Sequence, residues 1–395
     1  MLTQDGCNER RTRLFGRLPA DCGWVLVADP RHVMYLTNFW VQPLSFSNGE
    51  RAAVLVERSG RATLFGDNFT LKSSATQPYA DETIDFDWYN HKRSTINRDQ
   101  ALLKAFADAR PDVCSASHGL IEIEAVPEMF HAALDEMGAK ILGVELAESF
   151  VQEGTTIRDV GTALRCCRRQ KLPDEVELLS ACMRATEAGH KWARENVAPG
   201  KTDLEMYRGV QSAAISEAGR PAIVYGDFRR CTPASPKQGG LPVGEMLAAG
   251  DTYVLDYSVM LDGYRSDFTN TIAVGDVSDA VRKNFGTCQR AMEAGEEVLA
   301  AGVPCRDVYA AVNAAFEEDG IAGSFPHHAG HGLGLGHPEW PTLVPDSQDI
   351  LLPGDVVTLE PGSYVEGVGG MRIEHNYLVT DEGYDRLSNH VIDLG

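Results

Sequence analysis

The chain has 395 residues, more than one ordinary hydrophobic core supports, and its 43% apolar and 24% charged residues are typical of a soluble globular protein. A formal net charge of −21 argues against nucleic acid as a partner, because an acidic surface repels phosphate backbones. We expect no signal peptide, and no apolar run approaches the roughly 18 residues that a membrane span needs. Nine cysteines without paired spacings predict free thiols in a reducing cytoplasm and no structural zinc cluster.

The first part of the chain predicts an α/β domain over residues 1–160. Short apolar runs at residues 23–28, 52–57, 62–65 and 120–123 indicate strands, and residues 126–137 have helical spacing. This mixture predicts a sheet flanked by helices. Nothing in the segment matches a phosphate-binding loop or a nucleophile elbow.

A second domain is predicted over residues 165–395. We interpret the basic run at residues 165–171 as a solvated linker at its start. A helix should follow Pro173, and Thr202 with Glu205 forms a capping box that begins another. A faint internal repeat suggests two similar α-α-β-β halves; its matching positions are Gly200 and Gly302, Tyr207 and Tyr309, and Val210 and Val312.

The segment 252–273 predicts a β-hairpin that carries two aspartates. Asp262-Gly263 is a strong two-residue turn signal, and this turn places Asp256 opposite Thr269. Asp256 and Asp267 then share one face as diagonal neighbours about 7–8 Å apart. They can lean together onto two metal ions about 3.5–4 Å apart. The alternative is a pair of solvent-facing aspartates on a sheet edge.

The segment 326–339 concentrates histidine and glycine. Glycines that alternate with other residues let the backbone bend and approach a neighbour closely. His331 lies between two of them, where its ring can point inward, and His337 is offset toward a substrate. His327 and His328 either support the site or pack beside it. A nucleotide loop is a weak interpretation, because no phosphate fingerprint matches.

A second hairpin is predicted over residues 356–379. Glu360 ends an apolar strand, and Arg372 and Glu374 share a face of the returning strand. A glutamate at the end of a buried strand is costly unless it is paired. Its partner is either a metal ion or Arg372. Together, four carboxylates and one imidazole predict a site for two divalent cations.

These residues resemble the pita-bread metallopeptidases, which include prolidase, aminopeptidase P and methionine aminopeptidase, with creatinase and a dimethylsulfoniopropionate lyase as non-peptidase relatives. The resemblance covers residues 165–395, and residues 35–39 are similar to the family's creatinase-like N-terminal α/β domain. It implies an α+β pita-bread domain with pseudo-twofold halves. The motifs that carry it are Leu255-Asp256-Tyr257, Gly263-Tyr264-Arg265-Ser266-Asp267, Gly330-His331-Gly332-Leu333-Gly334, Leu359-Glu360-Pro361-Gly362 and Arg372-Ile373-Glu374.

The resemblance also implies a role for each site residue. Two divalent metals, manganese first and then cobalt, iron or zinc, would be held by Asp256, Asp267, His331, Glu360 and Glu374. The implied catalytic residues are Glu360, His337 and Arg372, and the implied substrate-binding residues are His327, His328 and Tyr264. A homodimer is implied as well, with no membrane partner.

One departure concerns the substrate. Family peptidases usually carry another histidine before the first hairpin, and here residues 231–240 contain none; Lys237, Gln238 or Arg230 are the candidate substitutes. The sequence predicts a hydrolase that cleaves a small peptide before proline with a metal-bridging hydroxide. The alternatives are another enzyme on the same metal site, such as a dimethylsulfoniopropionate lyase or a small amide hydrolase, and an inactive binding module.

Overall fold

The computed structural model describes residues 1–20, 22–27, 29–41, 52–86, 105, 108–109, 121–122, 157–158 and 160–395. Contacts within the chain divide it into two compact units, Met1–Arg168 and Arg169–Gly395. Within those described ranges, each helix is too short or too polar to cross a bilayer.

The first unit contains a four-stranded sheet in the order β1-β2-β3-β4, in which only the β3–β4 pair is parallel. The strands predicted at 23–28, 52–57 and 62–65 are confirmed, and a two-residue strand lies within 120–123. The helix predicted at 126–137 lies outside the described residues. The elements are α1 Gln4–Gly16, β1 Trp24–Val27, α2 Pro30–Thr37, β2 Ala52–Glu57, β3 Ala62–Asp67, α3 Asn68–Lys72, β4 Glu82–Phe86, β5 Ile121–Glu122, β6 Ile157–Arg158 and α8 Gly161–Arg169.

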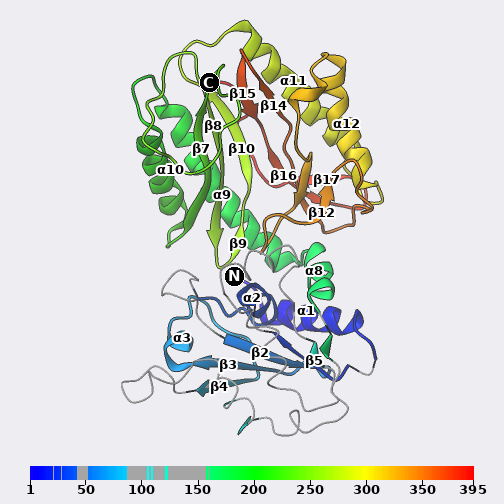
Figure 1. Cartoon of the computed structure of the whole chain (residues 1–395). Coiled ribbons are helices and arrows are strands. Elements are labelled where there is room, and N and C mark those ends of the chain that lie inside the picture. Colours follow the sequence, from blue (N-terminus) through cyan, green and yellow to red (C-terminus); the bar gives the residue numbers. More distant parts are fainter. Residues whose placement is uncertain are drawn as a thin grey trace. The chain divides into compact units, whose positions relative to one another are not determined.

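The second unit consists of two groups of strands, each with its own helix pair (Figure 1). Helices α9 and α10 pack on β8 and β7, and α11 packs on β14 and β15. The elements are α9 Pro173–Asn196, α10 Asp203–Ala218, β7 Ile223–Cys231, β8 Thr252–Leu261, β9 Tyr264–Arg265, β10 Phe268–Ala273, α11 Asp279–Val298, α12 Cys305–Glu318, the 3₁₀ turn η1 Ala322–Ser324, β11 Gly330–Gly332, β12 Glu339–Leu343, β13 Val356–Leu359, β14 Gly362–Val365, β15 Gly369–Arg372, β16 His375–Val379 and β17 Tyr384–Arg386.

The first hairpin has the register that its turn predicts. Leu261 pairs with Tyr264, and Asp256 pairs with Thr269. Asp262 and Gly263 both have positive φ, at 49° and 83°, as a tight two-residue hairpin turn requires. Asp256 and Asp267 therefore lie on one face of the hairpin, since residues two apart on a strand point the same way.

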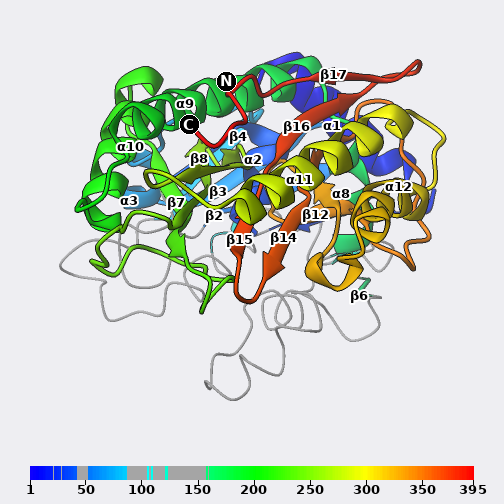
Figure 2. The ribbon, with the colours of Figure 1, turned by 90° about the horizontal axis from the view of Figure 1, so that it is seen from above.

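The internal repeat predicted from the sequence is present in the hydrogen bonding of the two halves. Each half ties the start of its second helix to a distant segment with the same pair of backbone bonds. The pairs are Gly200 N–Leu247 O with Leu247 N–Lys201 O, and Gly302 N–Leu351 O with Leu351 N–Val303 O. Seen from above, α10 lies at the left of the second unit and α12 at the right, and α11 crosses the strands of its own half between them (Figure 2).

Glycines at equivalent places let the helices of each half pack closely. A Cβ on Gly189 of α9 would lie 2.8 Å from a methyl group of Val210 on α10. A Cβ on Gly295 of α11 would lie 2.8 Å from a methyl group of Val312 on α12. Both valines were matched in the repeat, so the two halves use the same close helix contact.

The interpretation of residues 165–171 as a solvated linker is wrong. Residues 161–169 form α8, and Arg168, Arg169 and Lys171 are all buried. Arg169 donates two hydrogen bonds to Asp355, at 3.1 and 2.7 Å, and Lys171 Nζ lies 3.3 Å from a carboxylate oxygen of Glu339. Arg169 and Lys171 can be buried because each has an acidic partner far along the chain.

Helix α9 follows Pro173 as predicted and buries one stripe, formed by Leu179, Met183, Thr186 and Ala193. His190 is packed in the same interior, stacked on Phe268, and its Nε2 donates to the Phe268 carbonyl oxygen 3.2 Å away. This histidine therefore has a structural role behind β10.

Candidate metal centre

The second predicted hairpin is interrupted where its glutamates lie. Strand β13 pairs with β16 as far as Leu359 and His375, and β14 pairs with β15 from Gly362 and Arg372. Both pairs have the same register, so Glu360 and Glu374 stand opposite each other in the gap between two sheets. Their backbones are bonded elsewhere, Glu360 N to Ala329 O and Glu374 N to Thr269 O. The Glu374 carboxylate reaches the strands of the first half, where Thr269 Oγ1 donates to it, whereas Glu360 Oε1 faces His331 of its own half.

Strand β11 carries His331 in a space that only glycine neighbours allow. A Cβ on Gly330 would lie 1.9 Å from the Thr358 carbonyl oxygen, and one on Gly332 would lie 2.0 Å from that of Trp340. The close approach predicted for these glycines is therefore to neighbouring backbone. This close approach fixes the backbone of His331. The His331 ring is fixed by a hydrogen bond of 2.8 Å from Nδ1 to the carbonyl oxygen of Gly332.

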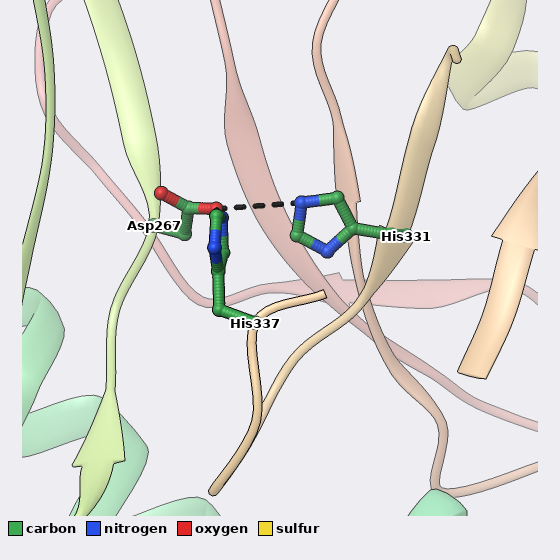
Figure 3. Close-up of side chains that lie close together, drawn as sticks. All are labelled: Asp267, His331 and His337. Atoms are coloured by element: carbon green, nitrogen blue, oxygen red, sulfur yellow. Dashed lines mark ion pairs between the residues drawn. The ribbon is translucent and has the colours of Figure 1, made fainter. Parts of the chain in front are cut away.

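Two histidines reach the same aspartate. Figure 3 shows the rings of His331 and His337 directed at the carboxylate of Asp267. Their Nε2 atoms lie 3.5 and 2.5 Å from Asp267 Oδ2. His331 Nε2 is also 3.5 Å from Glu360 Oε1, so this imidazole lies between carboxylates of the two halves.

A second cluster joins three carboxylates through the same aspartate. Asp256, Asp267 and Glu374 each offer an oxygen, and these atoms all lie within 4.8 Å of one another. Glu374 is 1% exposed; one of its oxygens accepts from Thr269 Oγ1, and Oε1 has no hydrogen-bond partner. A buried carboxylate oxygen without a partner is costly, and a cation would satisfy it.

The electrostatics of the cluster point to the same requirement. Burial, reinforced by the charge of Asp267, raises the pKa of Glu374 well above its usual range. Burial also raises the pKa of Asp256 to about 6, against the opposing effect of Arg372. Although burial raises the pKa of Asp267 too, His337 and His331 hold it well below its usual range. Carboxylates this close repel one another, so the donor set fits divalent cations that prefer oxygen ligands.

Arg372 is not the partner of Glu360 that one alternative expected. Its Nη2 pairs with Asp256 and lies 3.3 Å from Asp227, while its Nη1 donates to Tyr364 Oη at 2.8 Å. Sequence reasoning missed Asp227 and Tyr364. Asp227 had a detectable signal, because it is an acidic residue within strand β7, where it pairs directly with Asp256.

The residues expected to bind substrate separate into two groups. His327 and His328 gather with Glu360, with donor atoms of all three within 4.8 Å of one another. Tyr264 does not belong with them. Its ring is fully buried, and its hydroxyl donates to Glu175 of α9 at 2.8 Å, so this tyrosine braces the helix and cannot contact a substrate.

The profile of metallopeptidase family M24 matches residues 177–381, which contain every residue of both clusters. The chain belongs to metallopeptidase family M24. It is therefore a metal-dependent peptidase, as its complete set of candidate ligands also indicates. The family resemblance inferred from the motifs is confirmed.

Full-length relatives agree with this assignment. An uncharacterised peptidase of Staphylococcus aureus is 25% identical over 376 residues, which span 94% of this chain and 95% of the relative. An Xaa-Pro dipeptidase from Bacillus anthracis has a similar structure, with a TM-score of 0.74 and 22% identity over 99% of both chains. Prolidase from Pyrococcus horikoshii matches with a TM-score of 0.71 and 21% identity over 98% of this chain and 99% of that one. The expected pita-bread fold is confirmed.

Proposed function

We propose that this peptidase is a dinuclear enzyme of the Xaa-Pro dipeptidase or aminopeptidase type, which cleaves small peptides before proline. The observation that carries the proposal is a pair of adjoining ligand groups. Asp256, Asp267 and Glu374 gather around a buried Glu374 oxygen that has no hydrogen-bond partner, and His331 Nε2 lies 3.5 Å from both Asp267 and Glu360. The names of the Bacillus and Pyrococcus structures motivate the choice of substrate.

The donor set also suggests which metals would bind. Asp256, Asp267, Glu360 and Glu374 contribute oxygen and only His331 contributes nitrogen, so manganese is the first choice. When bound, two such ions supply an activated water and polarise the scissile carbonyl. Asp267 belongs to both clusters, so it would help to hold both metals.

Two residues of the chain handle protons and hydrogen bonds in this proposal. Although burial opposes it, His328 and His331 lower the pKa of Glu360 to about 2, so this carboxylate is ionised. In the proposed mechanism it accepts the proton of the attacking water. It returns the proton to the leaving nitrogen. His337, whose side chain is one-third exposed beside Asp267, donates a hydrogen bond to the substrate carbonyl.

Lys237 is a better candidate than Arg230 for the missing histidine. Its Nζ lies 5.2 Å from the ring centroid of Tyr364, whose hydroxyl bonds to Arg372. Arg230 instead forms ion pairs with Asp251 and Glu245, which neutralise its charge. We infer that Lys237 pairs with the free carboxylate of a dipeptide, which favours dipeptidase activity.

The change Lys237→Gln tests this assignment. We expect KM for an Xaa-Pro dipeptide to rise about tenfold with little change in kcat, because a charged hydrogen bond contributes about 1.5 kcal/mol or more. The corresponding dipeptide amide, which has no carboxylate, should show no such change. An equal rise in KM for the acid and the amide would refute a carboxylate contact. Lys201→Gln, on the α10 side of the unit, serves as the matched control.

The substrate proposal is tested by assaying several Xaa-Pro dipeptides beside dimethylsulfoniopropionate, each with added manganese. We expect proline release that a chelator abolishes. Absence of proline release from every dipeptide would defeat the proposal. Cleavage of the sulfonium compound would establish the lyase alternative, which the absence of histidine in residues 231–240 favours.

Two further properties belong to the proposal. The eight cysteines in the described ranges are free thiols, as in cytoplasmic proteins, so we infer that the enzyme works in the cytoplasm. The homodimer implied by the resemblance stays a prediction, and sedimentation equilibrium would measure it.

A further inference from the structure

We propose that His327, His328 and Glu360 form a third divalent-metal site, which prefers zinc and inhibits the enzyme when zinc is in excess. This inference rests on the proposed function, which assigns Glu360 to the catalytic centre. The three residues offer two imidazole nitrogens and one carboxylate oxygen within 4.8 Å of one another.

His327 has the hydrogen bonding of a metal ligand. Its Nδ1 donates to the carbonyl oxygen of His328 at 2.9 Å, which leaves a lone pair on Nε2. The Nε2 atom is buried and has no hydrogen-bond partner. His331 has the same arrangement, with Nδ1 bonded to Gly332 O at 2.8 Å and Nε2 directed at carboxylates. Histidines that bind metals usually donate their other ring nitrogen to a carbonyl or carboxylate in this way.

His328 completes the donor set from the other side of the glutamate. Its Nδ1 lies 3.1 Å from Glu360 Oε1. The rings of His327 and His328 stand edge to face, with 68° between their planes and centroids 5.8 Å apart. This edge-to-face packing leaves ring nitrogens of both residues able to face one ion, which parallel stacking would hinder.

The surrounding residues keep the site open and the His327 ring in place. Phe325 and Tyr364 contact the ring edge to face, with centroids 4.9 and 5.7 Å away. A Cβ on Gly362 would lie 3.0 Å from His327 Nε2. Glycine at this position therefore leaves the nitrogen accessible to a small ion.

The site differs from the carboxylate centre in the metal that it prefers. A set of two histidines and one glutamate is a known zinc combination, whereas oxygen-rich sets suit manganese. An ion held on Oε1 of Glu360 would add a further positive charge to a carboxylate that already serves the catalytic metals, and would weaken its affinity for a proton. Zinc bound here would therefore stop Glu360 from accepting the proton of the attacking water, even with the other metals in place.

The test counts zinc ions in metal-free protein by isothermal titration and elemental analysis. We expect three zinc ions per chain in the wild type and two in His328→Gln. The zinc concentration that inhibits the manganese-loaded enzyme by half should rise at least tenfold in this variant. An unchanged zinc count and an unchanged inhibition in His328→Gln would overturn the proposal.

Two further variants separate this site from the rest of the centre. Asp267→Asn should reduce zinc binding at the carboxylates and keep the ion that His328→Gln removes. If the dinuclear proposal itself fails, the wild type will bind fewer than three ions, and the ion that depends on His328 will still be lost in His328→Gln. Gly362→Ala adds a methyl group close to His327 Nε2 without altering any ligand, and we expect it to weaken zinc binding. An unaltered zinc affinity in both Gly362→Ala and His328→Gln would contradict the site.

Discussion

Replacement of Asp267 by alanine is expected to lower kcat/KM of metal-dependent peptide hydrolysis at least a thousandfold, which corresponds to about 4 kcal/mol of transition-state stabilisation. Asp267 is the one residue common to the cluster with His331 and His337 and the cluster with Asp256 and Glu374. Its loss would remove a ligand from both metal positions at once. The neighbouring carboxylates could not replace it, because each already serves as a ligand in the centre.

Kinetics with saturating manganese and a manganese-dependent thermal shift are the two measurements. A metal that binds the native state raises Tm, and we expect this rise to disappear in Asp267→Ala. Without metal, the variant should be as stable as the wild type or more so, because the mutation relieves repulsion among buried carboxylates. Asp276→Ala, at an exposed aspartate that follows β10, is the control and should leave both measurements unchanged. Full activity in Asp267→Ala would refute the assigned centre.

The change Arg169→Met is expected to reduce the free energy of unfolding by about 3–5 kcal/mol, the usual cost of breaking a buried ion pair. Asp355 is completely buried, and its carboxylate accepts two bonds from Arg169 and one from the Leu352 backbone. Without the guanidinium, a buried charge would remain with only a backbone donor. Urea unfolding of the metal-free protein measures the loss.

A double variant distinguishes the ion pair from general packing. Arg169→Met with Asp355→Leu should recover much of the lost stability, because both charges are then absent from the interior. Arg306→Met, at an arginine that is half exposed, should change stability by less than about 0.5 kcal/mol. A loss in Arg169→Met no larger than in Arg306→Met would mean that the basic run is solvated after all.

The first hairpin could be predicted in detail because its information is local. The turn at Asp262-Gly263 sets the register, and the period of two along each strand then places Asp256 and Asp267 on one face. The glycines beside His331 could likewise be assigned a close backbone approach. The backbone that approaches these glycines is that of Thr358 and Trp340. Its identity could not be predicted, because it depends on strands that come later in the chain.

The errors share a physical cause. Arg169 and Lys171 look solvated in a run of basic residues, and their burial depends on Asp355 and Glu339, more than 150 residues away. Arg372 lies two residues from Glu374, yet it pairs with Asp256 and Asp227 of the other half. In each case the electrostatic partner is distant in sequence, and local patterning carries no information about it.

The sequence by itself determined the family, the order of elements in the second unit and the five candidate ligands, because motif spacing and strand periodicity are local properties. Only the tertiary structure decided which of these groups share a buried space. It placed Glu374 with an unsatisfied oxygen beside two aspartates and gathered His327 and His328 around Glu360. It also placed the Tyr264 hydroxyl in a hydrogen bond to Glu175 of α9, away from any substrate. Such distinctions depend on packing between the two halves, and burial decides whether a polar group is paired or exposed.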